Sequence, residues 1–111
     1  MTTDNPLAIA CSLAPGEYPQ RLREFTVLFA SIRELRREPA RLYLALDAST
    51  VREEDVRDVL RREQACCPFF TFLVEATSDA VHVEAAVPEG AEAWLDGLQR
   101  LAEQATATAR P

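Results

Sequence analysis

The chain has 111 residues and a mass of 12.4 kDa, which suits one domain with a single modest core. Its hydrophobic share of 48% and charged share of 27% lie near the averages of globular domains, which excludes a disordered chain. No apolar run approaches the ~20 residues that cross a bilayer, so we expect no contact with a membrane. The net charge of −6 predicts repulsion from phosphate backbones and argues against direct binding of nucleic acid.

The first part of the chain predicts a strand, a helix and a second strand. Residues 1–6 are polar and acidic, unlike a secretion signal, so we expect a flexible N-terminus and a cytoplasmic protein. The segment LAIACSL (residues 7–13) is short, apolar and bounded by turn formers, which favours a first strand. Apolar residues then recur at helical spacing from Pro19 to Arg37, with a proline soon after as the stop. RLYLALDA (residues 41–48) alternates between two faces and predicts the second strand.

A second helix is predicted before the paired cysteines. Thr50 and Glu53 have the spacing of a capping box, in which the hydroxyl and the carboxylate each satisfy a backbone amide. We expect the helix to run to about Cys67, because Pro68 cannot continue it easily.

The last part of the chain predicts a hairpin and a third helix. Strands near residues 69–76 and 80–87 surround the turn formers Thr77-Ser78-Asp79, and Ala91–Ala105 has helical periodicity. Residues 106–111 are expected to form a frayed tail. The order β-α-β-α-β-β-α predicts one α+β domain over residues 7–105, with a mainly antiparallel sheet and helices packed on one face.

Two of the three cysteines, Cys66 and Cys67, stand side by side at the predicted helix end. Cysteine often packs as a small hydrophobe, so core filling is the ordinary interpretation. Adjacent residues at a helix end point about 100° apart, however, so at least one thiol should lie near the surface or near an internal polar site. Redox catalysis is disfavoured, because a helix C-terminus opposes a thiolate and the CxxC spacing is missing.

Glu63 interrupts an apolar seam on the same helix. Val56, Leu60 and Cys67 lie along that seam at spacings of three and four residues. A carboxylate there must reach water, find a partner or stay protonated, because burying it unpaired costs on the order of several kcal/mol. The sequence leaves these alternatives open.

Metal binding is compatible with a helix C-terminus, because a bound soft cation supplies the charge that deprotonates its thiols. Together with Cys11, the pair offers up to three sulfurs, which suit Hg(II) or As(III), and Cu(I) also accepts thiolates. Zinc would want a fourth ligand from Glu63 or His82. His82 points to the strand face opposite Val81 and Val83, and a lone strand histidine is more often solvated or hydrogen-bonded than a ligand.

Two motifs in the chain resemble those of the cysteine-containing accessory domain that follows the DNA-binding part of many heavy-metal-responsive, mercury-type MerR-like bacterial regulators. IACSL and EQACCPFFTFLVE match an Ala-Cys-Ser/Thr-Leu segment and a Glu-x-x-Cys-Cys-x-Phe-Phe-x-Phe segment. The matching residues are Ala10, Cys11, Ser12, Leu13, Glu63, Cys66, Cys67, Phe69, Phe70 and Phe72. The resemblance covers roughly residues 7–98 and implies a module that senses or holds a soft metal ion, with Cys11 joined to the vicinal thiols. The DNA-binding part is absent, so direct DNA binding is not implied.

The leading hypothesis is therefore a non-enzymatic domain that binds or senses a thiophilic ion through Cys11, Cys66 and Cys67. Hg(II) is the favoured ion, with As(III), Zn(II) or Cu(I) as alternatives, and Glu63 or His82 would lie beside the ligands. The other expected partner is a transcription regulator or a second copy of the chain. Two further classes stay open: a thiol-dependent organometal lyase or reductase with Glu63 as proton donor, and an interaction or dimerisation module with structural cysteines.

Overall fold

The structure is a computed structural model that describes residues 18–109. In chain order these residues form α1 (Tyr18–Phe29), β1 (Ile32–Glu38), β2 (Arg41–Asp47), α2 (Glu53–Cys66), β3 (Thr71–Ala76), β4 (Ala80–Ala86) and α3 (Glu92–Ala109). The strands form one sheet in the order β1-β2-β4-β3, and every neighbouring pair is antiparallel. The predicted α+β class and the antiparallel sheet are confirmed.

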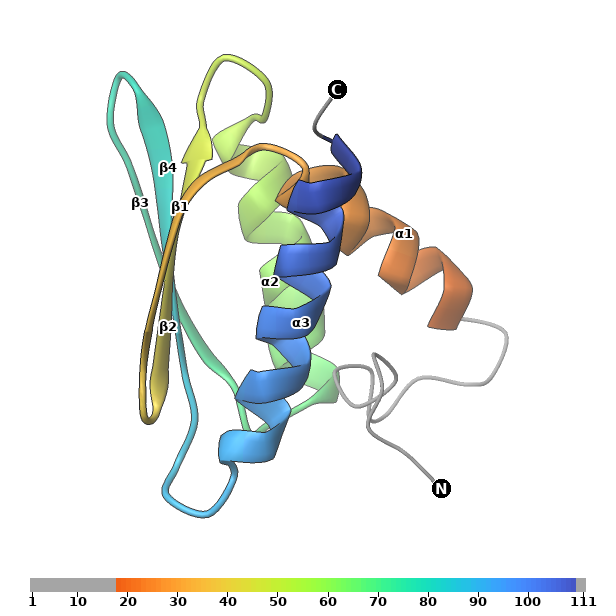
Figure 1. Ribbon diagram of the computed structural model, residues 1–111, viewed down its shortest axis with the longest axis vertical. Helices are drawn as coiled ribbons and strands as arrows, with labels where there is room; N and C mark the ends of the chain where they lie inside the picture. Colours follow the sequence, from red (N-terminus) through yellow and green to blue (C-terminus); the bar gives the residue numbers. More distant parts are fainter. Residues whose placement is uncertain (1–17, 110–111) are drawn as a thin grey trace.

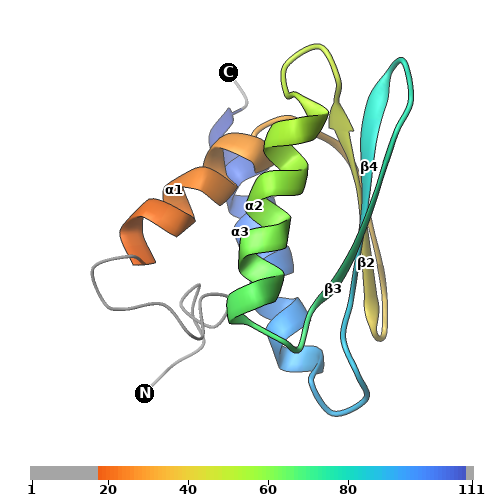
Figure 2. The ribbon, with the colours of Figure 1, turned by 180° about the vertical axis from the view of Figure 1, so that it is seen from behind.

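The helices lie on one side of the sheet, as predicted (Figure 1). α2 and α3 pack against the sheet, and α1 crosses them on the side away from the strands, as the reverse view also shows (Figure 2). Within residues 18–109, no helix covers the opposite face of the sheet. The contact between α1 and α2 is therefore buried at Arg21 and Glu63 and partly exposed at Glu24 and Arg62, whereas the outer face of the sheet is open.

The core fills the space between the sheet and the helices. In β2 the predicted alternation places Leu42, Leu44 and Leu46 toward the helices, where each is at most 3% exposed. Phe25 of α1 and Leu95 of α3 are completely buried in the same apolar cluster. Because burial of such side chains stabilises a fold by about 1.5–3 kcal/mol each, this cluster holds the helices in place over the sheet.

The helix predicted from Pro19 to Arg37 is wrong in its second half. α1 ends at Phe29, and Ile32–Glu38 forms an edge strand that pairs with β2. Residues 39–40 make the turn between these strands, with Glu38 opposite Arg41. The sequence IRELRRE is rich in helix formers, and pairing with the apolar strand β2 overrides that local preference.

The predicted capping box at Thr50 and Glu53 is also wrong. The N-cap of α2 is Arg52, which makes no side-chain capping hydrogen bond. The Thr50 hydroxyl lies 2.7 Å from Oγ of Ser31 instead. Asp47 accepts hydrogen bonds from the amide and hydroxyl of the serine two residues later, so this stretch forms a side-chain-stabilised turn before the helix begins.

The other predicted elements agree with the structure or fall outside it. β2, α2 and the β3–β4 hairpin lie within a few residues of the expected bounds. α3 extends to Ala109, so the segment expected to fray from Thr106 begins as helix. The strand predicted over residues 7–13, which carries Cys11, lies outside the described residues.

Candidate metal site

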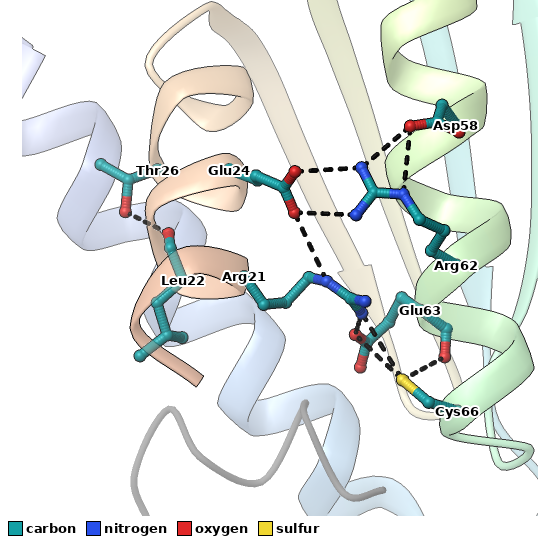
Figure 3. Close-up of polar contacts among 8 residues, drawn as sticks. All are labelled: Arg21, Leu22, Glu24, Thr26, Asp58, Arg62, Glu63 and Cys66. Atoms are coloured by element: carbon teal, nitrogen blue, oxygen red, sulfur yellow. Dashed lines mark hydrogen bonds and ion pairs between the residues drawn. The ribbon is translucent and has the colours of Figure 1, made fainter. Parts of the chain in front are cut away.

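Arg21 and Glu63 form a buried ion pair where α1 crosses α2 (Figure 3). Nη1 of Arg21 lies 2.5 Å from Oε1 of Glu63, and the two side chains are 8% and 0% exposed. The sequence left open whether the carboxylate of Glu63 reaches water, finds a partner or stays protonated. The side chain does not reach water, and it has a charged partner in Arg21. Water is displaced from both groups, so their attraction is stronger than that of a surface pair.

Sequence reasoning did not find Arg21. The arginine precedes Phe25 by four residues and Leu28 by seven, so the three side chains lie along one face of α1. Phe25 and Leu28 are 0% and 6% exposed, which makes this the buried face of the helix. The sequence therefore contained one indication of this ion pair, namely an arginine and a glutamate on the buried faces of two different helices.

Cys66 lies against the same ion pair (Figure 3). Its sulfur accepts a hydrogen bond from Nη1 of Arg21 at 3.5 Å. The sulfur also lies 3.5 Å from the backbone oxygen of Glu63 and 3.9 Å from Oε1, and either oxygen can accept the thiol proton. The side chain is half-buried, so this thiol occupies a polar and partly accessible position.

Cys67 occupies a different environment from its neighbour. Its side chain is completely buried and belongs to the apolar core. Its backbone amide donates a 2.8 Å hydrogen bond to the carbonyl of Glu63, which caps the end of α2. One thiol of the pair is therefore core and the other lies at an internal polar site, as expected for adjacent residues at a helix end.

Burial raises the pKa of Glu63 above its ordinary value of 4.5 to about 7, and the hydrogen bond and charge of Arg21 oppose this rise only in part. The second carboxylate oxygen, Oε2, is buried and has no hydrogen-bond partner among the described residues. Burial removes water from the carboxyl group, and the ionised form loses more hydration free energy than the neutral acid, so the neutral acid is favoured. Glu63 can therefore hold or release a proton near neutral pH, beside Cys66.

A second arginine extends the ion pair into a network between the two helices. Arg62 of α2 contacts both carboxylate oxygens of Glu24 on α1, at 3.1 and 3.0 Å, and also contacts Asp58. Nε of Arg21 lies 3.5 Å from Glu24, which links the two arginines through one carboxylate. The interhelical polar cluster, as we name it, consists of Arg21, Glu24, Asp58, Arg62, Glu63 and Cys66.

Aromatic side chains fix the turn that follows the two cysteines. Phe69 stacks on Trp94 of α3 with ring centroids 5.3 Å apart, and Phe70 stacks on Phe72 at the same distance. The amide of Phe70 also bonds to the carbonyl of Cys67 at 3.2 Å. The stack of Phe69 on Trp94 holds this turn against α3, and Phe70, which is 1% exposed, packs in the core.

The other candidate residues are not brought to the thiols by the described part of the chain. His82 is exposed on the outer face of the sheet, opposite Ala45 and Glu75, whereas the cysteines lie on the helix side. Cys11 lies outside the described residues. Between residues 18 and 109, no three histidine, cysteine or acidic side chains form a group with the geometry to hold a metal ion.

Comparison with known proteins identified no related family, protein or structure. A scan against protein-family models gave no match, and searches of curated proteins and of solved structures gave no significant match. The resemblance to MerR-type accessory domains therefore stays a prediction from two motifs. As for membranes, none of the helices described here combines the length and apolar character needed to cross a bilayer.

Proposed function

We propose that the protein binds a thiophilic heavy-metal ion, Hg(II) in the first place, through the thiolates of Cys66, Cys67 and Cys11. The observation that carries this proposal is the position of Cys66, whose half-buried sulfur lies beside a buried ion pair, 3.5 Å from the guanidinium of Arg21 and 3.9 Å from the carboxyl group of Glu63, and whose neighbour in the chain is a second cysteine. Soft ions prefer thiolates, and a proton acceptor beside the thiol helps to form one. Cys11 enters as the third ligand through the motif resemblance.

Ligation by both vicinal sulfurs requires Cys67 to turn out of the core toward Cys66. Cys67 has φ −132° and ψ 88°, outside the helical region, and its backbone amide donates a hydrogen bond to the carbonyl of Glu63. Removing one small side chain from the core costs about 1–2 kcal/mol. Binding of a structural metal ion by thiolates releases about 10–16 kcal/mol in small domains. This free energy exceeds the cost of moving the Cys67 side chain out of the core.

Anaerobic titration with HgCl2 tests the proposal. We expect an ultraviolet ligand-to-metal band that saturates near one equivalent, because the ion takes all the thiolates of one chain. Cys66→Ser and Cys67→Ser should each weaken binding by more than the roughly 10–100-fold that loss of a group supporting a ligand costs, with Ser78→Ala in the β3–β4 turn as a control. Absence of the band, or unchanged affinity in Cys66→Ser, contradicts the proposal.

A second candidate function is the cleavage of a carbon–mercury bond. The specific observation in its favour is Glu63, whose pKa near 7 leaves a proton available 3.9 Å from the Cys66 sulfur. In such a reaction the thiolates bind mercury, the carbon–mercury bond breaks and the carbon takes the proton of the acid. Incubation with a phenylmercuric salt separates the functions, because an enzyme releases benzene over many turnovers and a binding protein takes up one equivalent only.

A further inference from the structure

β3 forms one edge of the sheet, so one side of its backbone faces no other strand of residues 18–109. The amide of Thr77 donates a 2.8 Å hydrogen bond to the carbonyl of Ala80 where the β3–β4 hairpin closes, and hydrogen-bonded pairs alternate along the ladder from there. The N–H and C=O groups of Phe72 and Val74 therefore point away from β4, toward the edge. Such groups are a template for pairing with another strand.

Two side chains of α2 reach this edge, where α2 lies beside β3 (Figure 2). Oε1 of Gln64 accepts a 3.1 Å hydrogen bond from the amide of Phe72. Nη2 of Arg57 donates a 2.9 Å hydrogen bond to the carbonyl of Val74. These side chains supply the acceptor and the donor that a neighbouring strand would supply. Both are long and exposed, so an incoming backbone can displace them.

The space between α2 and β3 is a groove with a volume of about 480 Å³. Apolar side chains, among them Leu60, Phe72 and Val74, line it together with Arg57 and Arg61. None of the described residues that line the groove is acidic, although the whole chain has a net charge of −6. Each arginine contacts a carboxylate elsewhere on α2, but both pairs are exposed and contribute little. The groove is therefore complementary in charge to an acidic segment.

We propose that this groove binds an extended, acidic segment of a partner protein, which adds to the sheet as a strand beside β3. In strand addition, backbone hydrogen bonds give affinity and alternate side chains give specificity. Acidic side chains of the segment lie on the α2 side, against Arg57 and Arg61, and the intervening side chains lie on the outer face beside Leu73, which is 58% exposed. The interaction uses none of the thiols, so it is independent of the proposed function.

The other edge of the sheet and a second copy of the chain fit less well. β1 has an irregular register between Ile32 and Glu34, and such bulges protect an edge from pairing, whereas β3 pairs with β4 without interruption. Antiparallel pairing of β3 with the β3 of a second copy would place the two α2 helices side by side. The arginines of both grooves would then lie close together, which like-charge repulsion opposes. The occupant is therefore a different chain of opposite charge.

Fluorescence anisotropy with a labelled peptide tests the proposal. The probe is a short synthetic peptide of alternating glutamate and valine, and we expect saturable binding that a peptide of alternating lysine and valine does not show. Two further peptides carry backbone N-methyl groups, one on its glutamates and the other on its valines. Only alternate N–H groups of an added strand face β3, so one methylated peptide should lose binding and the other should keep it. Absence of binding, or an equal effect of the two methylations, overturns the proposal.

Variants of the groove test its charge and the side chain that occupies the edge. Arg61→Glu should weaken binding at least about fivefold, and Arg36→Glu, at the opposite edge, makes the same change in net charge and should have little effect. Gln64→Ala should tighten binding about two- to tenfold, because it removes the side chain that competes for the amide of Phe72. A merely structural role of Gln64 predicts no gain. Equal weakening by the two charge reversals, or no gain in Gln64→Ala, overturns the proposal.

Sedimentation velocity of the wild type distinguishes the peptide from a second copy. A monomer, or a dimer that Leu73→Glu leaves intact, agrees with the proposal, because the edge is then available to a different chain. A dimer that Leu73→Glu converts to a monomer assigns this edge to a second copy and overturns it.

Discussion

The Arg21–Glu63 pair of the interhelical polar cluster and the Arg36–Glu38 pair on the outer face of the sheet use the same chemical groups in opposite surroundings. On the outer face, Arg36 lies 2.7 Å from Glu38 and 4.0 Å from the centre of the Tyr43 ring, and the two charged side chains are 63% and 45% exposed. In the cluster, Arg21 and Glu63 are 8% and 0% exposed. Both are short arginine–carboxylate contacts, so the distance alone does not distinguish them.

Solvent access makes the difference between the two regions. An exposed pair contributes about 0–1 kcal/mol, because water solvates each partner whether or not the pair forms. A buried pair has lost that solvation, so each partner depends on the other, and the removal of one leaves a charge without compensation. The same loss of water raises the pKa of Glu63. The buried contact is therefore the one able to couple stability, protonation and the nearby thiol.

Arg21→Met should produce the largest change in stability. It leaves the carboxyl group of Glu63 buried without its partner, and we expect the free energy of unfolding to fall by about 3 kcal/mol at neutral pH. A domain of this size has a total stability of roughly 5–15 kcal/mol, so the loss should be plain in urea denaturation followed by circular dichroism.

Arg21→Met/Glu63→Leu is the matched control for that variant. It removes both charges and fills the space with apolar atoms, so its stability should lie within about 1 kcal/mol of the wild type or above it. A double variant as unstable as Arg21→Met would mean that packing of the arginine side chain, and not the unpaired charge, explains the loss.

The protonation of Glu63 should make stability depend on pH. Its pKa is about 7 in the folded protein and near 4.5 when unfolded, so between these values the folded state holds a proton that the unfolded state has released. The contribution of this proton is complete below the lower value and is lost as the pH rises through the upper one. We expect the wild type to lose up to about 3 kcal/mol relative to Glu63→Gln between about pH 5 and about pH 8. Parallel pH profiles of unfolding free energy for the two proteins would contradict the raised pKa.

The sequence predicted the elements whose structure follows from the local pattern of apolar residues. It did not predict the features that depend on a residue or strand distant in the sequence. The alternation of Leu42, Leu44 and Leu46 predicted β2, because one face of a strand must be buried wherever its neighbours lie. Ile32–Glu38 was predicted as helix, because its own residues do not indicate that it pairs with β2 across a short turn. The need of Glu63 for a partner was likewise visible from its apolar seam. The identity of that partner was not visible, because the chain has many arginines and only the packing of α1 across α2 brings Arg21 to Glu63.

Arg36→Met on the outer face should produce the smallest change in stability. It tests the exposed ion pair in the same way that Arg21→Met tests the buried one. The variant removes a solvated ion pair and the contact of the guanidinium with the Tyr43 ring, which together contribute about 1 kcal/mol or less at exposed sites. We therefore expect a shift in melting temperature of only a few degrees, measured beside Arg21→Met under identical conditions. A loss as large as that of Arg21→Met would mean that the outer face is shielded from water in solution, as it would be against a second copy of the chain. In that case the stability of the wild type should also rise with protein concentration, because the association of two copies stabilises the folded state by mass action.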